Sequence, residues 1–403
     1  MNKGPLSGIR ICDFTWAWAG PQCTRLLADM GAEVIKIESG KRPDIGRRLP
    51  PFNNDKPGLN RSGRFQKRNR GKLSITLNLT KPEGIELVKK IIKKSDILTE
   101  NFSRRVMKEF ELEYEAVKKL NESIIYLSLS AFGNDGPYKD FVAYGPNQSG
   151  LCGLGSFFGY KDGPPINMGV ALGDPTAGLY GAVALLAALY HRKKTGKGQS
   201  IDLSQTEILT CVTSQALMDY SMNKRVAVPE GNSDPFMAPH GFFPCKGDDQ
   251  WVSIAIGNEN EWQAFCNAVG NPEWCLQEKF SSCKGRLENE AELNQQVTSW
   301  TNKFDKLEVM EIFQQAHVAA MPIFDGREII NNEHLKERGF LAAIKHPEVG
   351  KHIMHGLSMK LSKSSGQIKR APLLGEHNQY VFGDLLGLGN DEIAKLQEEE
   401  IIY

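Results

Sequence analysis

One aspartate stands out among the acidic side chains, because its surroundings suit a chemical role. Asp174 lies in GVALGDPTAGLYG, residues 169–181, and the apolar helical stretch after it contains no acid until Asp202. An Asp before Pro175 predicts the start of a helix, with Asp174 as the capping residue. A carboxylate at a helix N-terminus is also held ionised and oriented, as a nucleophile must be. The motif alone leaves both roles open.

The histidines bear on this choice. All eight, from His191 to His377, follow residue 190, so a Ser-His-Asp or Cys-His site within the preceding part has no base. A carboxylate needs no such activation, since it is already ionised at neutral pH. His240, in the loop sequence MAPHG, is the one histidine with two open roles, a loop hydrogen-bond donor or a substrate contact.

A basic segment, residues 41–72, is the next candidate for binding chemistry. It holds eleven Lys and Arg against two Asp. Such a run forms either a solvated face or a phosphate-binding rim, since Arg forks match phosphate geometry. Nucleic-acid binding would need interleaved aromatic residues, and only Phe52 and Phe65 are present. A phosphorylated small ligand is therefore the better prediction.

Two common site types are disfavoured. The turn after the first predicted strand, DFTWAWAGPQ, has a single glycine instead of G-x-G-x-x-G, so Glu38 alone does not predict a nicotinamide site. The eight cysteines are scattered, with no CxxC and no Cys/His cluster of zinc spacing. We expect reduced thiols, no metal site and no prosthetic group.

Alternating strand-like and helical stretches must position these residues. Apolar runs predict strands over 9–14, 34–37, 73–79, 123–133 and 201–203. Apolar faces and capping signals predict helices from Pro21 to about Met30 and over 82–94, 175–192 and 204–222. The 175–192 helix is apolar on most faces, so we expect it to be buried. This alternation predicts a parallel sheet with ligands near the carboxyl ends of its strands.

Size and composition set the outer limits. The chain has 403 residues, 40% of them hydrophobic, and a net charge of +1, which predicts a soluble protein of two domains. A Gly-, Pro- and Asp-rich stretch at 226–248 predicts a domain boundary. The longest apolar run has 14 residues, too few to span a bilayer, and MNKGPLSGIR lacks a signal core. We expect a cytoplasmic protein with no membrane or nucleic-acid partner.

Several motifs, taken together and in order, carry a family resemblance. They are WAWAGP, LLADMGAEVIKIE, NRGKLSITLNL, DILTENF, LSLSAFGNDGPY, GVALGDPTAGLYG, RKKTGKGQSIDLSQTE and APLLGEHN. The chain resembles the class III CoA-transferases over nearly its whole length. The resemblance implies an α/β fold with an open Rossmann-like large domain and a smaller α/β domain, in an interlocked homodimer. It implies a large CoA-binding domain over 1–205, a linker over 206–248, a small domain over 249–325, and a return to the large domain over 326–403.

The resemblance also implies roles for individual residues. Asp174 matches the nucleophile, which forms an aspartyl anhydride and then an aspartyl-CoA thioester while CoA moves between carboxylic acids. The matches to CoA-contacting positions are Trp18, Ala19, Leu77, Asn78, Thr80, Asn101, Phe102, Ser103 and Tyr144. The cations offered for the CoA phosphates are Arg47, Arg70, Lys72 and Lys108. Met237, His240 and Gly241 fall where the family places its substrate pocket.

Departures from the family pattern keep the substrates open. Ser39 follows Glu38 where an Arg is frequent, Glu109 replaces a CoA-binding Arg, Gly145 stands where some members have a carboxylate, and the glycine-rich flap is absent. Phenylalanines at 157, 158, 236, 242 and 243 suggest a bulky or aromatic acceptor acid, with succinyl-CoA as donor. An acyl-CoA racemase or isomerase of the same family is the alternative, disfavoured because Tyr144 stands where that branch has His. A non-catalytic acyl-CoA-binding protein is a third reading.

Overall fold

The computed structural model describes residues 4–403, which form two compact units. The first unit comprises residues up to 155, 167–226 and 334–403, and the second comprises 156–166 and 227–333. The expected boundaries at 205, 248 and 325 therefore differ from the observed ones. Residues 205–226 stay with the first unit, and the strand 240–244, which was expected to lie in a linker, pairs within the second.

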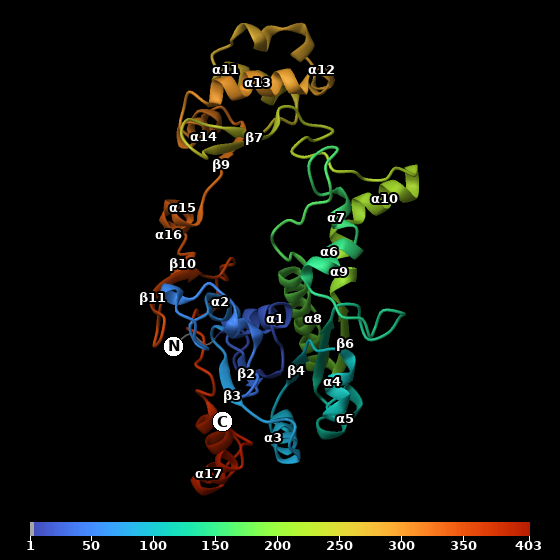
Figure 1. The fold of residues 1–403 in the computed structure, drawn as a ribbon, viewed down its shortest axis with the longest axis vertical. Helices are drawn as coiled ribbons and strands as arrows, with labels where there is room; N and C mark the ends of the chain where they lie inside the picture. The colour runs from blue at the N-terminus through green and yellow to red at the C-terminus, as the bar shows by residue number, and fades with distance from the viewer. Residues whose placement is uncertain (1–3) are drawn as a thin grey trace. The chain divides into compact units, whose positions relative to one another are not determined.

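A six-stranded parallel sheet forms the centre of the first unit (Figure 1). Its order is β3-β2-β1-β4-β5-β6, the doubly wound arrangement. The strands are β1 (Arg10–Asp13), β2 (Glu33–Glu38), β3 (Leu73–Thr76), β4 (Ile97–Glu100), β5 (Ile125–Ser130) and β6 (Gln199–Ser204). The expected parallel sheet is confirmed, but β4 was missed. Its sequence, ILTE, has only two adjacent apolar residues, whereas the equally short β3 lies in the alternating apolar stretch LSITLNL.

Helices cover both faces of this sheet. On one face α1 and α8 pack over an apolar cluster that includes Cys23, Leu27 and Leu185. On the other face α3, α4 and α5 cover a second cluster that includes Ile35 and Val88. The helices of this unit are α1 (Ala19–Asp29), α2 (Gly63–Asn69), α3 (Pro82–Lys93), α4 (Arg104–Glu109), α5 (Tyr114–Leu120), α6 (Gly145–Leu151), α8 (Gly173–Thr195), α9 (Gln205–Val212), α10 (Ser214–Asn223) and α17 (Asn390–Glu398).

Two helix predictions need correction. The 204–222 helix is divided at Thr213 into α9 and α10. The 175–192 helix, observed as α8, is buried along one face only, because Leu179, Val183 and Tyr190 are each about half exposed or more in the single chain. Because this helix is apolar on most sides, its sequence alone did not show which face packs on the sheet and which face is exposed.

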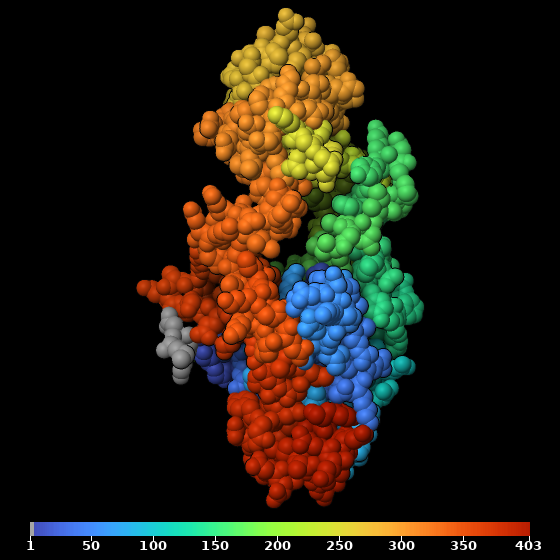
Figure 2. All heavy atoms as spheres, turned by 60° about the vertical axis from the view of Figure 1, so that its left-hand side comes forward, coloured from blue at the N-terminus to red at the C-terminus, as the bar shows by residue number. Residues whose placement is uncertain are grey.

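The C-terminal segment belongs to the first unit. The Asn78 N–H donates to Ile401 O at 2.9 Å, and the Thr76 hydroxyl donates to Tyr403 O at 2.6 Å. Figure 2 shows this segment, in red, packed beside the blue N-terminal part. Its further elements are α16 (Glu333–Glu337), the hairpin of β10 (Leu341–His346) and β11 (Gly350–His355), and a π-helical turn at Gln379–Leu385.

The second unit is a small α/β assembly with its own core. An antiparallel sheet of order β7-β8-β9 packs with helices around an aromatic cluster that includes Trp262, Phe265 and Phe313. Its elements are β7 (His240–Pro244), β8 (Trp251–Ala255), β9 (Ala319–Pro322), α11 (Glu259–Ala268), α12 (Cys283–Glu288), α13 (Glu290–Thr301), α14 (Lys306–Gln315) and α15 (Gly326–Asn331). The short α7 (Leu154–Phe157) lies where the chain passes between the units.

Candidate active site

The turn from β1 to α1 lies at the switch point of the sheet, where the chain order reverses between β1 and β4. Asn101, directly after β4, accepts from the Trp16 N–H at 2.7 Å and donates to Trp16 O at 3.0 Å. Phe102 packs edge-on against Trp16, with the two ring centroids 5.9 Å apart. Ligands of doubly wound folds bind at this crevice. Two of the predicted CoA contacts, Asn101 and Phe102, are therefore joined to the turn that carries two more, Trp18 and Ala19.

Buried charges hold this turn in an unusual conformation. Ala17 has φ 63°, a region that residues other than glycine seldom adopt. The Asp44 carboxylate accepts from the Ala17 N–H at 3.1 Å and from the Gly46 N–H at 2.8 Å, and it pairs with Lys36 at 2.9 Å. Lys36 also donates to Thr15 O at 2.6 Å. Strained backbone of this kind persists where surrounding contacts fix it, often at functional sites.

Asp174 lies in the first turn of α8, one residue inside the helix. The helix begins at Gly173 with Leu172 as the capping residue, so the expected cap role of Asp174 is wrong. The backbone N–H of Ala19, the first residue of α1, faces its carboxyl and lowers the pKa of that group. The approach of the two helices requires Gly178, since a methyl group there would lie 2.8 Å from Ala19 O.

The surroundings of Asp174 tune its charge. Burial raises the pKa of the carboxyl to about 6, while the positive charge of Arg68 and the Ala19 N–H oppose that rise. No Lys, Arg or His of residues 4–403 lies within 4.0 Å of it. Gly145, the first residue of α6, faces it directly, because a methyl group added there would lie 2.7 Å from Oδ2. Asp174 is thus a partly desolvated, unpaired carboxylate that is still mostly ionised at pH 7.

Arg68 is the cation whose charge lowers the pKa of Asp174, and the sequence analysis did not single it out. It is 6% exposed near the end of α2, its guanidinium stacks 4.0 Å from the Trp18 ring centroid, and Nη1 donates to Ala17 O at 3.0 Å. Within the crowded sequence FQKRNRGK nothing separates it from its basic neighbours.

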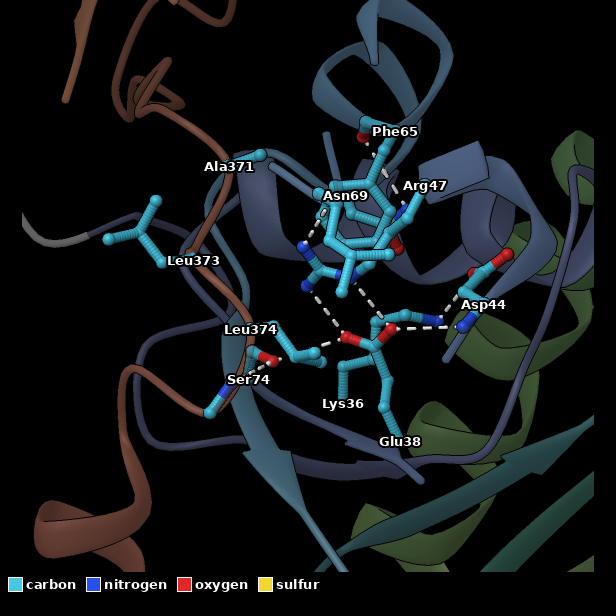
Figure 3. Close-up of polar contacts among 12 residues, drawn as sticks. Lys36, Glu38, Asp44, Arg47, Phe65, Asn69, Ser74, Ala371, Leu373 and Leu374 are labelled. Atoms are coloured by element: carbon cyan, nitrogen blue, oxygen red, sulfur yellow. Dashed lines mark hydrogen bonds and ion pairs between the residues drawn. The ribbon is translucent and has the colours of Figure 1, made fainter. Parts of the chain in front are cut away.

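The basic segment divides into buried structural cations and exposed ones. Arg47 is fully buried, bonds to Glu38 through two nitrogens at 2.7 and 2.8 Å, and stacks 3.6 Å from the Phe65 ring centroid (Figure 3). Arg70 pairs with Asp29 at 2.8 Å and Lys72 with Asp13 at 2.9 Å, both buried. These three predicted phosphate ligands therefore form ion pairs with carboxylates within the fold.

The other predicted CoA contacts lie along the carboxyl side of the sheet. Lys108 is exposed on α4, five residues after Ser103, which caps the N-terminus of that helix. Leu77 is buried, whereas Thr80 is exposed and donates to the Asn78 side chain, which also contacts the C-terminal segment. Tyr144 is 75% exposed and precedes α6.

The predicted substrate residues belong to the second unit. His240 and Gly241 line a cleft of about 290 Å³ with Phe242 and Met321, and the His240 ring bonds to Asn232 O at 2.7 Å. Met237 does not line this cleft and lies beside Gly257. The three predicted substrate residues therefore do not share one cleft, since His240 and Gly241 line it and Met237 lies outside it.

Fold and site together define an α/β enzyme with a carboxylate at the switch-point crevice, and comparisons specify the family. The CoA-transferase family III model matches residues 6–378. The succinyl-CoA–D-citramalate CoA-transferase of Chloroflexus aurantiacus is 31% identical, covering 99% of this chain and 98% of the relative. The succinate–glutarate CoA-transferase of Agrobacterium fabrum is 32% identical, and the match covers 95% of this chain and 96% of the relative. The crystal structure of a CaiB/BaiF family protein from Brucella suis superposes with a TM-score of 0.87 at 29% identity, covering 96% of this chain and 100% of that one.

This chain belongs to CoA-transferase family III and is an enzyme of the CoA-transferase class. Its substrates are accordingly CoA thioesters and acids. Among residues 4–403, no helix combines the length and apolar character needed to cross a membrane.

Proposed function

We propose that the enzyme transfers CoA from an acyl-CoA donor to a carboxylic acid through covalent intermediates on Asp174. The carboxylate attacks the thioester carbonyl, forming an aspartyl acyl anhydride and releasing CoA thiolate. The thiolate then attacks the aspartyl carbonyl, giving an aspartyl-CoA thioester and the free donor acid. The acceptor carboxylate attacks this thioester, forming a new anhydride and releasing thiolate. Attack of the thiolate on the acceptor acyl carbon yields the new acyl-CoA and restores Asp174.

The state of the Asp174 carboxylate is the observation that carries this proposal. It is partly desolvated, which strengthens a nucleophile, yet its pKa of about 6 leaves it ionised at pH 7. No salt bridge within residues 4–403 occupies its charge. We propose the Ala19 N–H, which lowers the pKa of this carboxyl, as the donor to the negative oxygen of each tetrahedral intermediate.

CoA binding is proposed at the crevice beside the β1–α1 turn. Asn101 and Phe102 contact Trp16 of this turn, and Trp18 and Ala19 follow Trp16 along the chain, which supports their predicted contacts with CoA. Exposed Lys108 is the most suitable of the predicted phosphate ligands, and Arg104 of the same helix is an exposed cation that the sequence reasoning missed. Leu77, Asn78, Thr80, Ser103 and Tyr144 remain predictions.

The substrates are proposed from the named relatives. Those relatives are named for succinyl-CoA, D-citramalate, succinate and glutarate, which are dicarboxylic acids or their thioester. We propose succinyl-CoA as donor and a dicarboxylic acid as acceptor. The predicted aromatic acceptor is the second candidate, favoured by exposed Phe236 and Phe242 in the second unit.

A homodimer in the cytoplasm is proposed as the working form. The exposed apolar residues of α8 and α10, which include Leu179, Val183, Met218 and Met222, form faces that a monomer rarely leaves open. The interlocked arrangement remains an implication of the family.

Transfer and isomerisation are separated by one experiment. Purified enzyme is incubated in deuterated water with succinyl-CoA and each of a panel of dicarboxylic and aryl acids, and products are followed by mass spectrometry. We expect a new acyl-CoA without deuterium at the α-carbon, and no product with Asp174→Asn. Deuterium uptake without CoA transfer would favour the racemase alternative, and binding without either reaction would favour a non-catalytic protein.

A further inference from the structure

Arg68 differs from every other buried lysine and arginine of residues 4–403, because no carboxylate lies within 4.0 Å of it. The others each have a carboxylate oxygen at 2.9 Å or less: Arg25, Lys36, Arg47, Arg70, Lys72, Arg286 and Lys306. Burying an unpaired charge is costly, so a fold retains one where something else compensates.

The guanidinium of Arg68 is oriented but not neutralised. Stacking on the Trp18 ring and the bond from Nη1 to Ala17 O fix its plane. Its Nε is buried and donates to no group of residues 4–403. Burial lowers the pKa of Arg68 to about 10, which leaves it charged at neutral pH. A fixed, charged fork with free donors is suited to a planar anion such as a carboxylate.

Arg68 and the helix that carries Asp174 approach the same turn. Arg68 donates to Ala17 O at 3.0 Å, and a methyl group at Gly178, one turn after Asp174 in α8, would lie 2.8 Å from Ala19 O. Each of the two charges also shifts the pKa of the other group. They attract each other without forming an ion pair within 4.0 Å. One small molecule can therefore meet both, with its acyl carbon at Asp174 and an anionic group at Arg68.

The reaction itself increases the need for such an anion. When Asp174 becomes an anhydride or a thioester its negative charge is lost, and of the two carboxylates that act on Arg68 only Asp44, already paired with Lys36, remains. A second carboxylate on the acyl group would replace the lost negative charge beside Arg68.

We infer that Arg68 binds the free carboxylate of the CoA half-thioester of a dicarboxylic acid and thereby selects dicarboxylic over monocarboxylic substrates. The inference rests on the proposed function, since it takes Asp174 as the group attacking the acyl carbon. It assigns Arg68 to specificity and leaves bond making to Asp174.

The test compares two thioesters that differ only at the far end of the chain. Single-turnover formation of the covalent adduct on Asp174 is measured with succinyl-CoA and with butyryl-CoA, whose methyl group replaces the carboxylate. The variants are Arg68→Met, Arg68→Lys and, as a matched control, Arg64→Met, which removes an exposed cation from the same helix. Thermal melting of each variant establishes that it folds.

We expect the wild type and Arg64→Met to prefer succinyl-CoA, and Arg68→Met to lose about 100-fold in kcat/KM for succinyl-CoA relative to butyryl-CoA. Arg68→Lys should retain part of the preference, since it keeps the charge. Equal losses for both thioesters would overturn the inference and indicate a contact with CoA or with Asp174. A wild type that prefers butyryl-CoA would also overturn it, with the transferase intact. Failure of the wild type to form an adduct with any thioester would refute the proposed function as well.

Discussion

Replacing Gly145 with alanine should disable the site by displacing the nucleophile. The added methyl group would lie 2.7 Å from Asp174 Oδ2 and 2.4 Å from the Ala171 Cβ, whereas ordinary contacts begin at 3.4 Å. Relief requires movements of about 0.7 and 1.0 Å, both in the segment that starts α8. Overpacking of this kind costs about 1–3 kcal/mol of stability. A displacement near 1 Å at the reacting group lowers kcat by about 100-fold.

Gly150 provides the matched control for this variant. It lies in the same helix, α6, and a methyl group there would meet nothing within 4 Å. Gly150→Ala should therefore keep full activity and gain about 0.5–1 kcal/mol in stability, as expected for Gly to Ala in a helix. Transfer from succinyl-CoA and the thermal midpoint are measured for both variants. Wild-type kcat in Gly145→Ala would refute the placement of Asp174 against this helix.

Three further predictions follow from the charged groups. Since burial raises the pKa of Asp174 to about 6, kcat/KM should fall tenfold per pH unit below pH 6, and a limb near the ordinary value of about 4 would contradict this. That raised pKa destabilises the fold progressively as the pH rises from about 4 to about 6, because the unfolded carboxyl ionises first. Asp174→Asn should therefore raise the free energy of unfolding at pH 7.5 by at most about 3 kcal/mol and lose this gain at pH 4, as calorimetry would show. Arg47→Met leaves Glu38 buried without its partner and should cost about 3–5 kcal/mol in denaturant unfolding, whereas exposed Arg48→Met should cost about 0.5 kcal/mol or less; equal effects would contradict a structural role for Arg47.

Much of the fold could be predicted from local sequence signals. The strands β2 and β5 each contain at least three apolar residues within six, and α3 carries one apolar face, so both kinds of element were recognised. The strand β4 was missed because ILTE has only two adjacent apolar residues, so its formation depends on pairing with β1 and β5 rather than on its own pattern. The split at Thr213 depends on tertiary packing, where its hydroxyl donates to Cys152 O at 3.0 Å.

The site was predicted less completely, for a physical reason. Asp174 could be found because its motif joins a chemical group to a helix start. Lys and Arg of the basic segment could not be sorted, since exposure and pairing depend on partners distant in sequence, such as Asp13 for Lys72 and Asp29 for Arg70. Arg68 was missed for the same reason, because its distinction is the lack of a carboxylate partner in three dimensions.

The covalent role of Asp174 is the central claim, and mass spectrometry of trapped enzyme tests it most directly. Enzyme is mixed briefly with succinyl-CoA, treated with hydroxylamine or borohydride, and digested, with Asp174→Ala treated in parallel. We predict that the untreated protein gains the mass of a CoA thioester or an acyl anhydride. Trapping should convert the peptide containing Asp174 to the hydroxamate or the alcohol, and the variant should show neither change. An adduct on another residue, or an adduct that persists in Asp174→Ala, would contradict the account.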